Sequence, residues 1–196
     1  MIEPERPAYD LTPQSLVWDV GSYRGDFSVG ILEKFGCHVM AFDPMPAYYE
    51  STVKREVKRG FLEVHAFGLA DRTYDREISL AGDRTSTHVL AATLPGYTPG
   101  PAIPCHFRDV VEFMDARTVG RVGLAKINIE GDEYALLRRL LDSGYIGRFG
   151  HLQVQFHTFV PDFGELYREI AEGLKPTHVL SWRKPWVWES WSRRPE

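Results

Sequence analysis

The chain has 196 residues and a formal net charge of −4, with acidic and basic side chains interspersed along it. This length predicts a single domain over residues 1–196, and the charge disfavours a nucleic-acid partner, which usually meets a basic face. The two cysteines, Cys37 and Cys105, lack metal-ligand spacing and predict neither a disulfide framework nor a zinc site. No apolar run approaches the roughly 18 residues of a membrane span, and the first residues lack the apolar core of a secretory signal. We therefore expect a cytoplasmic protein without a membrane span.

The first part of the chain alternates between strand and helix patterns. The predicted elements, in chain order, are an arm (1–14), a strand (15–20), a helix (27–35), a strand (37–42), a helix (47–59) and a strand (61–67). Gly36 is placed to end the first helix, as a glycine after the last helical turn often does. Regular alternation of this kind predicts an α/β fold, with a mostly parallel, twisted sheet and helices on both faces.

The middle of the chain is less regular, and the alternation then resumes. Residues 75–80 have a further strand pattern, and residues 82–104 hold turn residues typical of a lid or substrate-binding loop. The remaining predictions are a short helix (107–116), a strand (124–130), a helix (132–143), a strand (151–156), a helix (163–173) and a two-stranded hairpin (177–191).

The segment VWDVGSYRGDFS reads as a strand, a glycine-containing turn and a helix. Its glycines, Gly21 and Gly25, lack the middle glycine that lets a dinucleotide-binding loop approach a pyrophosphate. The loop therefore favours a nucleoside ligand without a pyrophosphate, and S-adenosylmethionine fits that description. Asp43, at the end of the next strand, is placed to accept hydrogen bonds from ribose hydroxyls, and Asp19 could meet the ammonium group of an amino-acid moiety. The alternative is an ordinary turn with a helix cap at Asp26.

Two later strand patterns carry polar residues at alternate positions. They are Lys126, Asn128 and Glu130 in LAKINIE, and Gln153, Gln155 and His157 in HLQVQFH. Side chains alternate with period two, so each trio would share one face of its strand. Buried polar groups need partners, and ligands of open α/β sheets bind beyond the carboxyl ends of the strands. If the two strands are neighbours, the trios predict a polar cleft with Glu130 and His157 at the strand ends. The alternatives are a solvated edge strand or an ion pair between Lys126 and Glu130.

Two further segments carry candidate binding residues. The loop RTSTH offers Thr85, Ser86 and His88 to an acceptor molecule, although an ordinary exposed loop accounts for it equally well. In the C-terminal hairpin, tryptophans alternate with polar residues at Trp182, Trp186, Trp188 and Trp191. Core packing or a homodimer face accounts for these rings better than carbohydrate stacking does.

Four segments resemble the FkbM-type methyltransferases in order and spacing: VWDVGSYRGDFS, AFDPMP, GLAD and KINIEGDEYALLRRL. The resemblance covers residues 16–158 and implies a Rossmann-like class I methyltransferase fold, with one antiparallel strand near the C-terminal edge of the sheet. It also implies an S-adenosylmethionine site formed by Asp19, Gly21, Ser22, Tyr23, Gly25, Phe27, Ser28, Asp43, Pro44, Gly68 and Leu69. The chain departs from the family pattern at three of its positions, with Ser22 for a smaller residue, Asp43 for Glu and Asn128 for Asp.

The resemblance further implies an O-methyltransferase that acts on a hydroxyl of a small molecule. Sugars and glycosides, including oligo- or polysaccharide precursors, are the favoured acceptors. His157 is the expected general base, because its ordinary pKa lies near neutral pH, and Glu130 would orient it or replace it. Asn128 cannot be a base, and Gln155 is expected to contact the acceptor. Glu130, His157 and Asn128 could also hold a Mg²⁺ ion, although histidine is an unusual ligand for that ion.

Two other classes of protein stay open. A nicotinamide-dependent oxidoreductase shares the sheet and the acid after the second strand, but the missing middle glycine counts against it. A non-catalytic module that binds the cofactor or a partner is compatible with Asn128 in place of Asp. A nucleic-acid methyltransferase is the least favoured reading, because the chain has no basic stripe.

Overall fold

The computed structural model describes residues 9–79 and 102–195. The elements of the first part are β1 (Leu16–Val20), α1 (Asp26–Phe35), β2 (His38–Phe42), α2 (Pro46–Val53), β3 (Phe61–His65), β4 (Gly68–Ala70) and β5 (Tyr74–Ser79). Those of the second part are β6 (Ala102–Asp109), α3 (Val110–Ala116), β7 (Val122–Ile127), α4 (Glu133–Asp142), the 3-10 helix η3 (Tyr145–Arg148), β8 (Phe149–Val154), α5 (Phe163–Leu174), β9 (His178–Lys184) and β10 (Trp188–Arg193). Within these ranges, no helix is long and apolar enough to cross a membrane.

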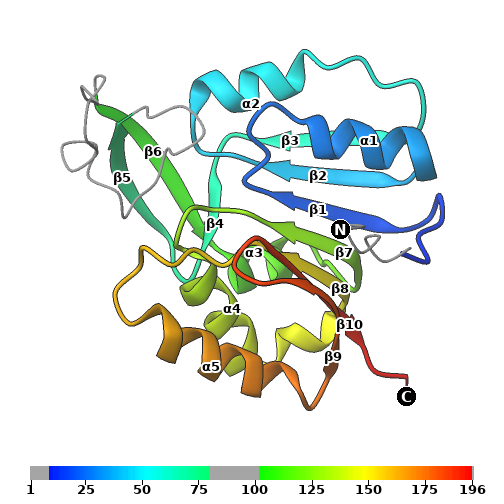
Figure 1. Ribbon diagram of the computed structural model, residues 1–196. Coiled ribbons are helices and arrows are strands. Elements are labelled where there is room, and N and C mark those ends of the chain that lie inside the picture. The colour runs from blue at the N-terminus through cyan, green and yellow to red at the C-terminus, as the bar shows by residue number, and fades with distance from the viewer. Residues whose placement is uncertain (1–8, 80–101, 196) are drawn as a thin grey trace.

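The main sheet has seven strands in the described parts of the chain, in the order β3-β2-β1-β7-β8-β10-β9 (Figure 1). Strands β1, β2, β3, β7 and β8 pair in parallel. β10 pairs antiparallel with both β8 and β9, so it is the one antiparallel strand of this sheet. The predicted α/β fold, with a mostly parallel sheet and one antiparallel strand near its C-terminal edge, is confirmed.

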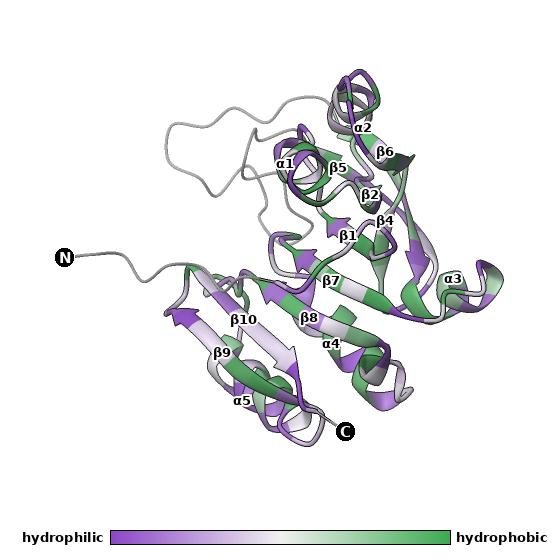
Figure 2. Cartoon of the chain, turned by 90° about the vertical axis from the view of Figure 1, so that its right-hand side faces the viewer, coloured by the Kyte–Doolittle hydropathy of each residue, from purple (hydrophilic) through white to green (hydrophobic). Residues whose placement is uncertain are grey.

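Helices cover the sheet from both sides, and Figure 2 shows α1 and α4 on opposite sides of the strands. On one face, Val17, Val39 and Leu124 pack against α1 through Leu32. On the other face, a larger core gathers side chains from α3, α4 and α5. Trp18 anchors this larger core, because its buried ring lies edge-on to the rings of Phe42, Phe113 and Phe149 at 5.3, 5.8 and 5.6 Å.

A second sheet, in the order β4-β6-β5, flanks the C-terminal ends of β1 and β2 (Figure 1). It corrects two predictions. Residues 102–104 belong to β6 rather than to the predicted loop 82–104, because β6 pairs with β5 over six residues. The predicted helix 107–116 begins only at Val110, because Asp109 caps it by accepting hydrogen bonds from the backbone N–H groups of Val111 and Glu112. The remainder of the predicted loop lies outside the described residues.

The helix predicted over residues 47–59 is also shorter in the structure. It ends at Val53, which is largely exposed and anchors nothing in the core. The chain then turns through Gly60, whose φ of 75° is a left-handed conformation, and enters β3 beside the carbonyl of Cys37. The return to the sheet therefore uses the residues that the sequence pattern assigns to the helix.

Two glycines predict opposite effects of the same substitution on stability. Gly30 lies inside α1, and a Cβ atom there would meet no atom within 4 Å. We expect Gly30→Ala to raise the free energy of unfolding by about 0.5–1 kcal/mol, because alanine loses less backbone entropy in a helix. At Gly60, a Cβ would lie 2.3 Å from the Cys37 carbonyl oxygen, and φ is 75°. Gly60→Ala should therefore lower the free energy of unfolding. Urea titration measures both variants, and equal effects at Gly30 and Gly60 would contradict the surroundings that the structure gives to these two glycines.

Candidate functional site

A cavity of about 290 Å³ lies at the carboxyl ends of β1, β2 and β7. Its walls come from segments that are far apart in the sequence. They are residues 20–24 and 26–27 around the end of β1, residues 42–45 and Tyr48 around the end of β2, Gly68 and Leu69 of β4, Phe107 of β6, and Lys126, residues 128–130 and Asp132 around the end of β7. The second sheet thus supplies one wall, and the strand ends supply the floor. This is the position at which open α/β sheets bind ligands.

The loop after β1 is pressed onto the ends of the neighbouring strands. Gly21 and Ser22 donate backbone hydrogen bonds to the carbonyl of Phe42, at 3.0 and 3.1 Å. At Gly21, where φ is 77°, a Cβ would lie only 1.9 Å from the carbonyl oxygen of Asn128. At Gly25, where φ is 76°, it would lie 2.8 Å from a methyl carbon of Thr52. Both glycines of the predicted loop are therefore required by close approach as well as by left-handed backbone.

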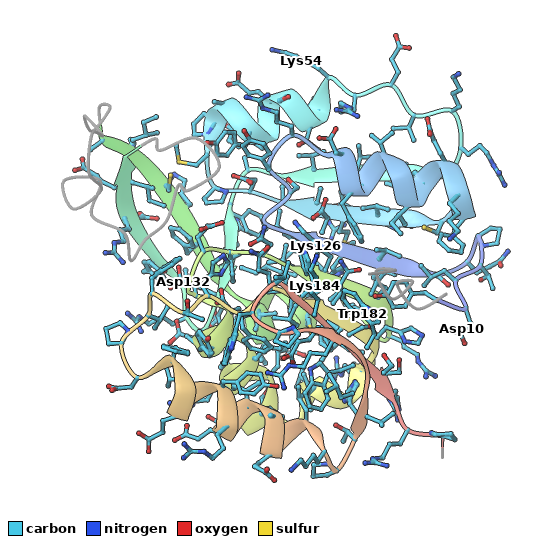
Figure 3. The ribbon with its side chains drawn as sticks, viewed as in Figure 1. Asp10, Lys54, Lys126, Asp132, Trp182 and Lys184 are labelled. Carbon is cyan, nitrogen blue, oxygen red and sulfur yellow. The ribbon has the colours of Figure 1, made fainter. Side chains whose placement is uncertain are left out.

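Beneath this loop, Lys126 forms a buried ion pair with Asp19. Lys126 lies near the middle of the sheet (Figure 3) and donates hydrogen bonds from Nζ to Asp19 Oδ1, at 2.9 Å, and to the Gly21 carbonyl, at 2.6 Å. The other carboxylate oxygen of Asp19 accepts a 2.7 Å hydrogen bond from Ser28. Asp19 is fully buried and, like Ser28, does not line the cavity. Asp19 therefore supports the loop from below, and its predicted contact with a ligand ammonium group stays a prediction.

Asp43 has the position predicted for an acid that meets a ligand. Its carboxylate lines the cavity, is almost fully buried, and accepts backbone hydrogen bonds from Tyr23 at 2.9 Å and Met45 at 3.0 Å. Burial raises the pKa of Asp43 to about 7, against the opposing effects of these two N–H groups and of Lys126. Burial therefore favours the neutral form of this carboxyl group far more than in an exposed aspartate.

Two polar side-chain atoms at the cavity have no hydrogen-bond partner among the described residues. They are Oγ of Ser22 and Oδ1 of Asn128, and both residues line the cavity. Buried polar atoms in folded proteins are nearly always paired. Ser22 and Asn128 therefore each place a buried, unpaired polar atom at the wall of the cavity, one after β1 and one after β7.

The two polar trios of the sequence do not form one continuous line. β7 ends at Ile127 and β8 at Val154, so only Lys126 and Gln153 lie on the strands, where they are direct neighbours. Gln153 accepts a hydrogen bond from the Tyr9 hydroxyl at 3.1 Å. Gln155 is half-buried and does not line the cavity. Both strand residues therefore have protein partners, although Lys126 also lines the cavity, and of the residues beyond the strand ends Asn128 and Glu130 line it.

Beyond these ends, His157 lies between two glutamates. Its Nδ1 atom is 3.1 Å from Glu133 Oε1, and its Nε2 atom is 3.5 Å from Glu130 Oε1. Glu130 lines the cavity, whereas His157 is buried and contacts the cavity only through Glu130. Burial on its own lowers the pKa of His157, but the hydrogen bonds and charges of Glu130 and Glu133 outweigh it and raise the pKa to about 9. At neutral pH the ligand-free imidazole is therefore protonated, and it must lose that proton before it can act as a base.

Glu133 is the site residue that the sequence reasoning missed. It is fully buried, and it accepts hydrogen bonds from the backbone N–H groups of Gly131 and His157, both at 2.8 Å, in addition to its contact with the His157 ring. An acid in the first turn of a helix usually indicates only a favourable interaction with the helix dipole. The signal in the sequence is the second glutamate of EGDE, two residues after the glycine that follows the predicted strand.

Other predicted residues are placed as follows. Of the predicted cofactor residues, the cavity is lined by Gly21, Ser22, Tyr23, Phe27, Asp43, Pro44, Gly68 and Leu69. Thr85, Ser86 and His88 lie outside the described residues.

In the C-terminal hairpin, Trp191 is buried in the core, whereas Trp186 is 41% exposed and packs on Phe163 and Tyr167. Over residues 9–79 and 102–195, no group of three or more His, Cys, Asp or Glu side chains is arranged to hold a metal ion, so the predicted Mg²⁺ site lacks support.

No protein-family model matches the chain, and no curated protein matches it. The solved structures that are similar in fold include an rRNA methylase and a fibrillarin protein. An rRNA methylase from Streptococcus thermophilus has 13% sequence identity and a TM-score of 0.53, over 93% of this chain and 89% of that one. The fibrillarin pre-rRNA processing protein of Methanococcus jannaschii has 11% identity and a TM-score of 0.52, over 97% of this chain and 71% of that one. These similarities confirm the Rossmann-like methyltransferase fold, and the resemblance to the FkbM subfamily stays a prediction.

The buried pair of Lys126 and Asp19 predicts a large effect on stability. Lys126→Met leaves the Asp19 carboxylate buried, with the Ser28 hydroxyl as its remaining side-chain donor among the described residues. We expect the free energy of unfolding to fall by about 3–5 kcal/mol, the usual cost of breaking a buried ion pair on one side. The double variant Asp19→Asn/Lys126→Met should recover part of this loss, because neither charge is then left alone. A single variant as stable as the wild type in urea would contradict the assigned pairing.

Proposed function

We propose that this chain is an S-adenosylmethionine-dependent O-methyltransferase that acts on a hydroxyl group of a small molecule, with a sugar or glycoside as the favoured acceptor. The observation that carries the proposal is the composition of the cavity. A buried carboxylate, Asp43, lies beside a glycine loop without a pyrophosphate-binding glycine. Ser22 and Asn128, each with a buried polar atom that has no partner among the described residues, line the same cavity. The fold shared with an rRNA methylase supports methyl transfer over other reactions of α/β sheets.

The residues present suit this cofactor. Asp43 holds oxygen atoms that can accept hydrogen bonds from ribose hydroxyls, as acids do at the end of the second strand of such sheets. Apolar walls for the adenine ring and the methionine chain come from Tyr23, Phe27, Leu69 and Phe107. Backbone at Gly21 and Gly68, together with Pro44 and Ser22, completes the proposed contacts. A volume of about 290 Å³ is at the lower end of the range for small-molecule sites.

The chain's own contribution to the reaction is position and proton transfer. When bound, the cofactor supplies a methyl group on a sulfonium sulfur, which keeps the electron pair of the carbon–sulfur bond as the methyl group leaves. The acceptor hydroxyl must then be held in line with that carbon and give up its proton. Glu130 is the carboxylate at the cavity wall that can receive the proton, and the positively charged ring of His157 lies beside it. Asn128 offers its side-chain oxygen for orientation of the acceptor or the cofactor.

Ligand titration tests the cofactor site. The wild type should bind S-adenosylhomocysteine and should not bind NADH in isothermal titration calorimetry. Binding to a nicotinamide cofactor instead would overturn the proposal in favour of the oxidoreductase. Asp43→Asn should weaken binding about tenfold, or ~1.4 kcal/mol. A carboxylate can accept hydrogen bonds from the ribose hydroxyls with both of its oxygens, whereas an amide can accept with its oxygen only. Asp75→Asn is the matched control, since Asp75 is exposed and pairs with His106 outside the cavity.

The same titration has an expected pH dependence. Burial raises the pKa of Asp43 to about 7, and hydroxyl donors of a ligand favour its charged form. Binding should therefore strengthen as pH rises from 6 to 8, through this pKa, and Asp43→Asn should remove that dependence. Equal slopes in the wild type and the variant would exclude Asp43 as a ligand of the ribose.

The acceptor is tested by turnover. Formation of S-adenosylhomocysteine should be measured with a panel of monosaccharides, glycosides and oligosaccharides, each with added Mg²⁺ and with EDTA. We expect product with a hydroxylated acceptor and no loss with EDTA. Because one structural neighbour is an rRNA methylase, an RNA transcript serves as the competing acceptor. Product with RNA alone would reject the small-molecule acceptor, and cofactor binding without any product would favour the non-catalytic module.

A further inference from the structure

One buried carboxylate ties together the two loops that carry Glu130 and His157. Glu133 Oε2 accepts from the backbone N–H of Gly131, in the turn after β7. Glu133 Oε1 accepts from the backbone N–H of His157, just beyond β8, and faces its ring nitrogen Nδ1. Glu133 has no exposed surface, so it meets neither solvent nor a ligand in the cavity directly. Its effect on the site must pass through the groups that it holds.

The contact with Nδ1 decides which way the imidazole points. With Nδ1 directed at Glu133, Nε2 is left facing Glu130 at 3.5 Å. The backbone of His157 is fixed as well, because its carbonyl accepts a 2.9 Å hydrogen bond from the Tyr134 hydroxyl on α4. The ring of Phe159 closes the third side, 5.2 Å from the imidazole centre. With these groups around it, the His157 ring is directed toward the cavity wall through Nε2, which faces Glu130.

The turn that bears Glu130 also depends on this carboxylate. Glu130 has a φ of 53° and Gly131 a φ of 111°. A non-glycine residue in the left-handed region is strained and is kept only where the surroundings fix it. The hydrogen bond from Gly131 to Glu133 fixes the turn one residue beyond Glu130. The Glu130 carboxylate is thus held from two sides, through its own backbone and through His157.

We propose that Glu133 is a positioning residue for the reaction proposed above: through the His157 ring and the Gly131 turn, it sets where the Glu130 carboxylate lies at the cavity wall. The proposal rests on the proposed function only in that Glu130 receives the acceptor proton. The arrangement of the three side chains can be measured without any turnover. It resembles in logic an acid that orients a histidine in a catalytic triad, with the difference that the histidine here acts on a second carboxylate.

The first test uses the wild-type protein without ligand. A proton on Nδ1 of His157, shielded from solvent and bonded to Glu133, should give a slowly exchanging, downfield imidazole ¹H–¹⁵N resonance. His157→Gln assigns that resonance by removing it. Glu133→Gln should abolish or strongly shift it, whereas Glu189→Gln should leave it in place. Glu189 is the matched control, because it is also a buried glutamate, but its hydrogen bonds go to Tyr167 and Trp191 away from the cavity.

The second test uses turnover and the coupling between variants. Glu133→Gln should lower kcat by about tenfold or more, because a small misplacement of a reacting group is costly. Its affinity for S-adenosylhomocysteine should stay within about twofold, since Glu133 does not line the cavity. In a His157→Gln background, Glu133→Gln should cost much less than on its own, because both residues act through the same contact. Glu189→Gln should lower stability while leaving kcat unchanged.

Each outcome has a distinct meaning. If His157 gives no Nδ1 resonance in the wild type, or Glu133→Gln leaves it unchanged, the proposal is wrong even if the protein is a methyltransferase. Fully additive losses of kcat would overturn it too. If Glu133→Gln does not fold, the wild-type resonance still decides the matter. Failure to bind S-adenosylhomocysteine would reject the proposed function, and the resonance of the ligand-free protein would still confirm or reject the role of Glu133.

Discussion

The site depends on one buried ion pair between neighbouring strands. Lys126 on β7 and Asp19 on β1 are 107 positions apart in the sequence, and their charges meet at 2.9 Å beneath the glycine loop. A buried charge without a partner is very costly, so the two strands can form the centre of the sheet only in the register that brings these side chains together. The same ammonium group holds the Gly21 carbonyl. The ammonium group of Lys126 therefore has two roles: it neutralises the buried Asp19 carboxylate, and it fixes the glycine loop that lines the cavity.

Parallel topology explains why polar groups of so many segments converge. The carboxyl ends of β1, β2, β7 and β8 point to the same edge, so the residue after each strand reaches the same space. The chain uses that edge in two ways. Asp43 beyond β2 is held by two backbone N–H groups, while Glu130 beyond β7 lies beside a protonated imidazole. One carboxyl group is suited to accept hydroxyl donors, and the other lies where a proton can be received.

Much of the fold follows from local patterns, because apolar runs and helical spacing are properties of neighbouring residues. The apolar runs before Gly21 and Asp43 predict β1 and β2, and Gly36 predicts the end of α1. Pairing between distant segments is not a local property. β6 was predicted to be loop and helix because nothing in its own sequence reveals that β5 supplies its partner strand. For the same reason, the partner of Gln153 proved to be Tyr9, in an arm that the sequence assigned no role.

The candidate site was predictable as a set of residues and not as a set of contacts. The alternation in LAKINIE correctly indicated that Lys126, Asn128 and Glu130 need partners, but it assumed a strand that continues to Glu130. The strand ends at Ile127, and the left-handed turn at Glu130 and Gly131 then redirects the chain into α4. That turn brings Glu133 into contact with His157. A pattern with a period of two or 3.6 residues cannot predict this contact, because the two residues belong to different segments. All three residues line the cavity, but their surroundings differ. Lys126 is paired with the buried Asp19, Asn128 has a buried side-chain oxygen without a partner among the described residues, and Glu130 lies beside His157, whose ring contacts the buried Glu133.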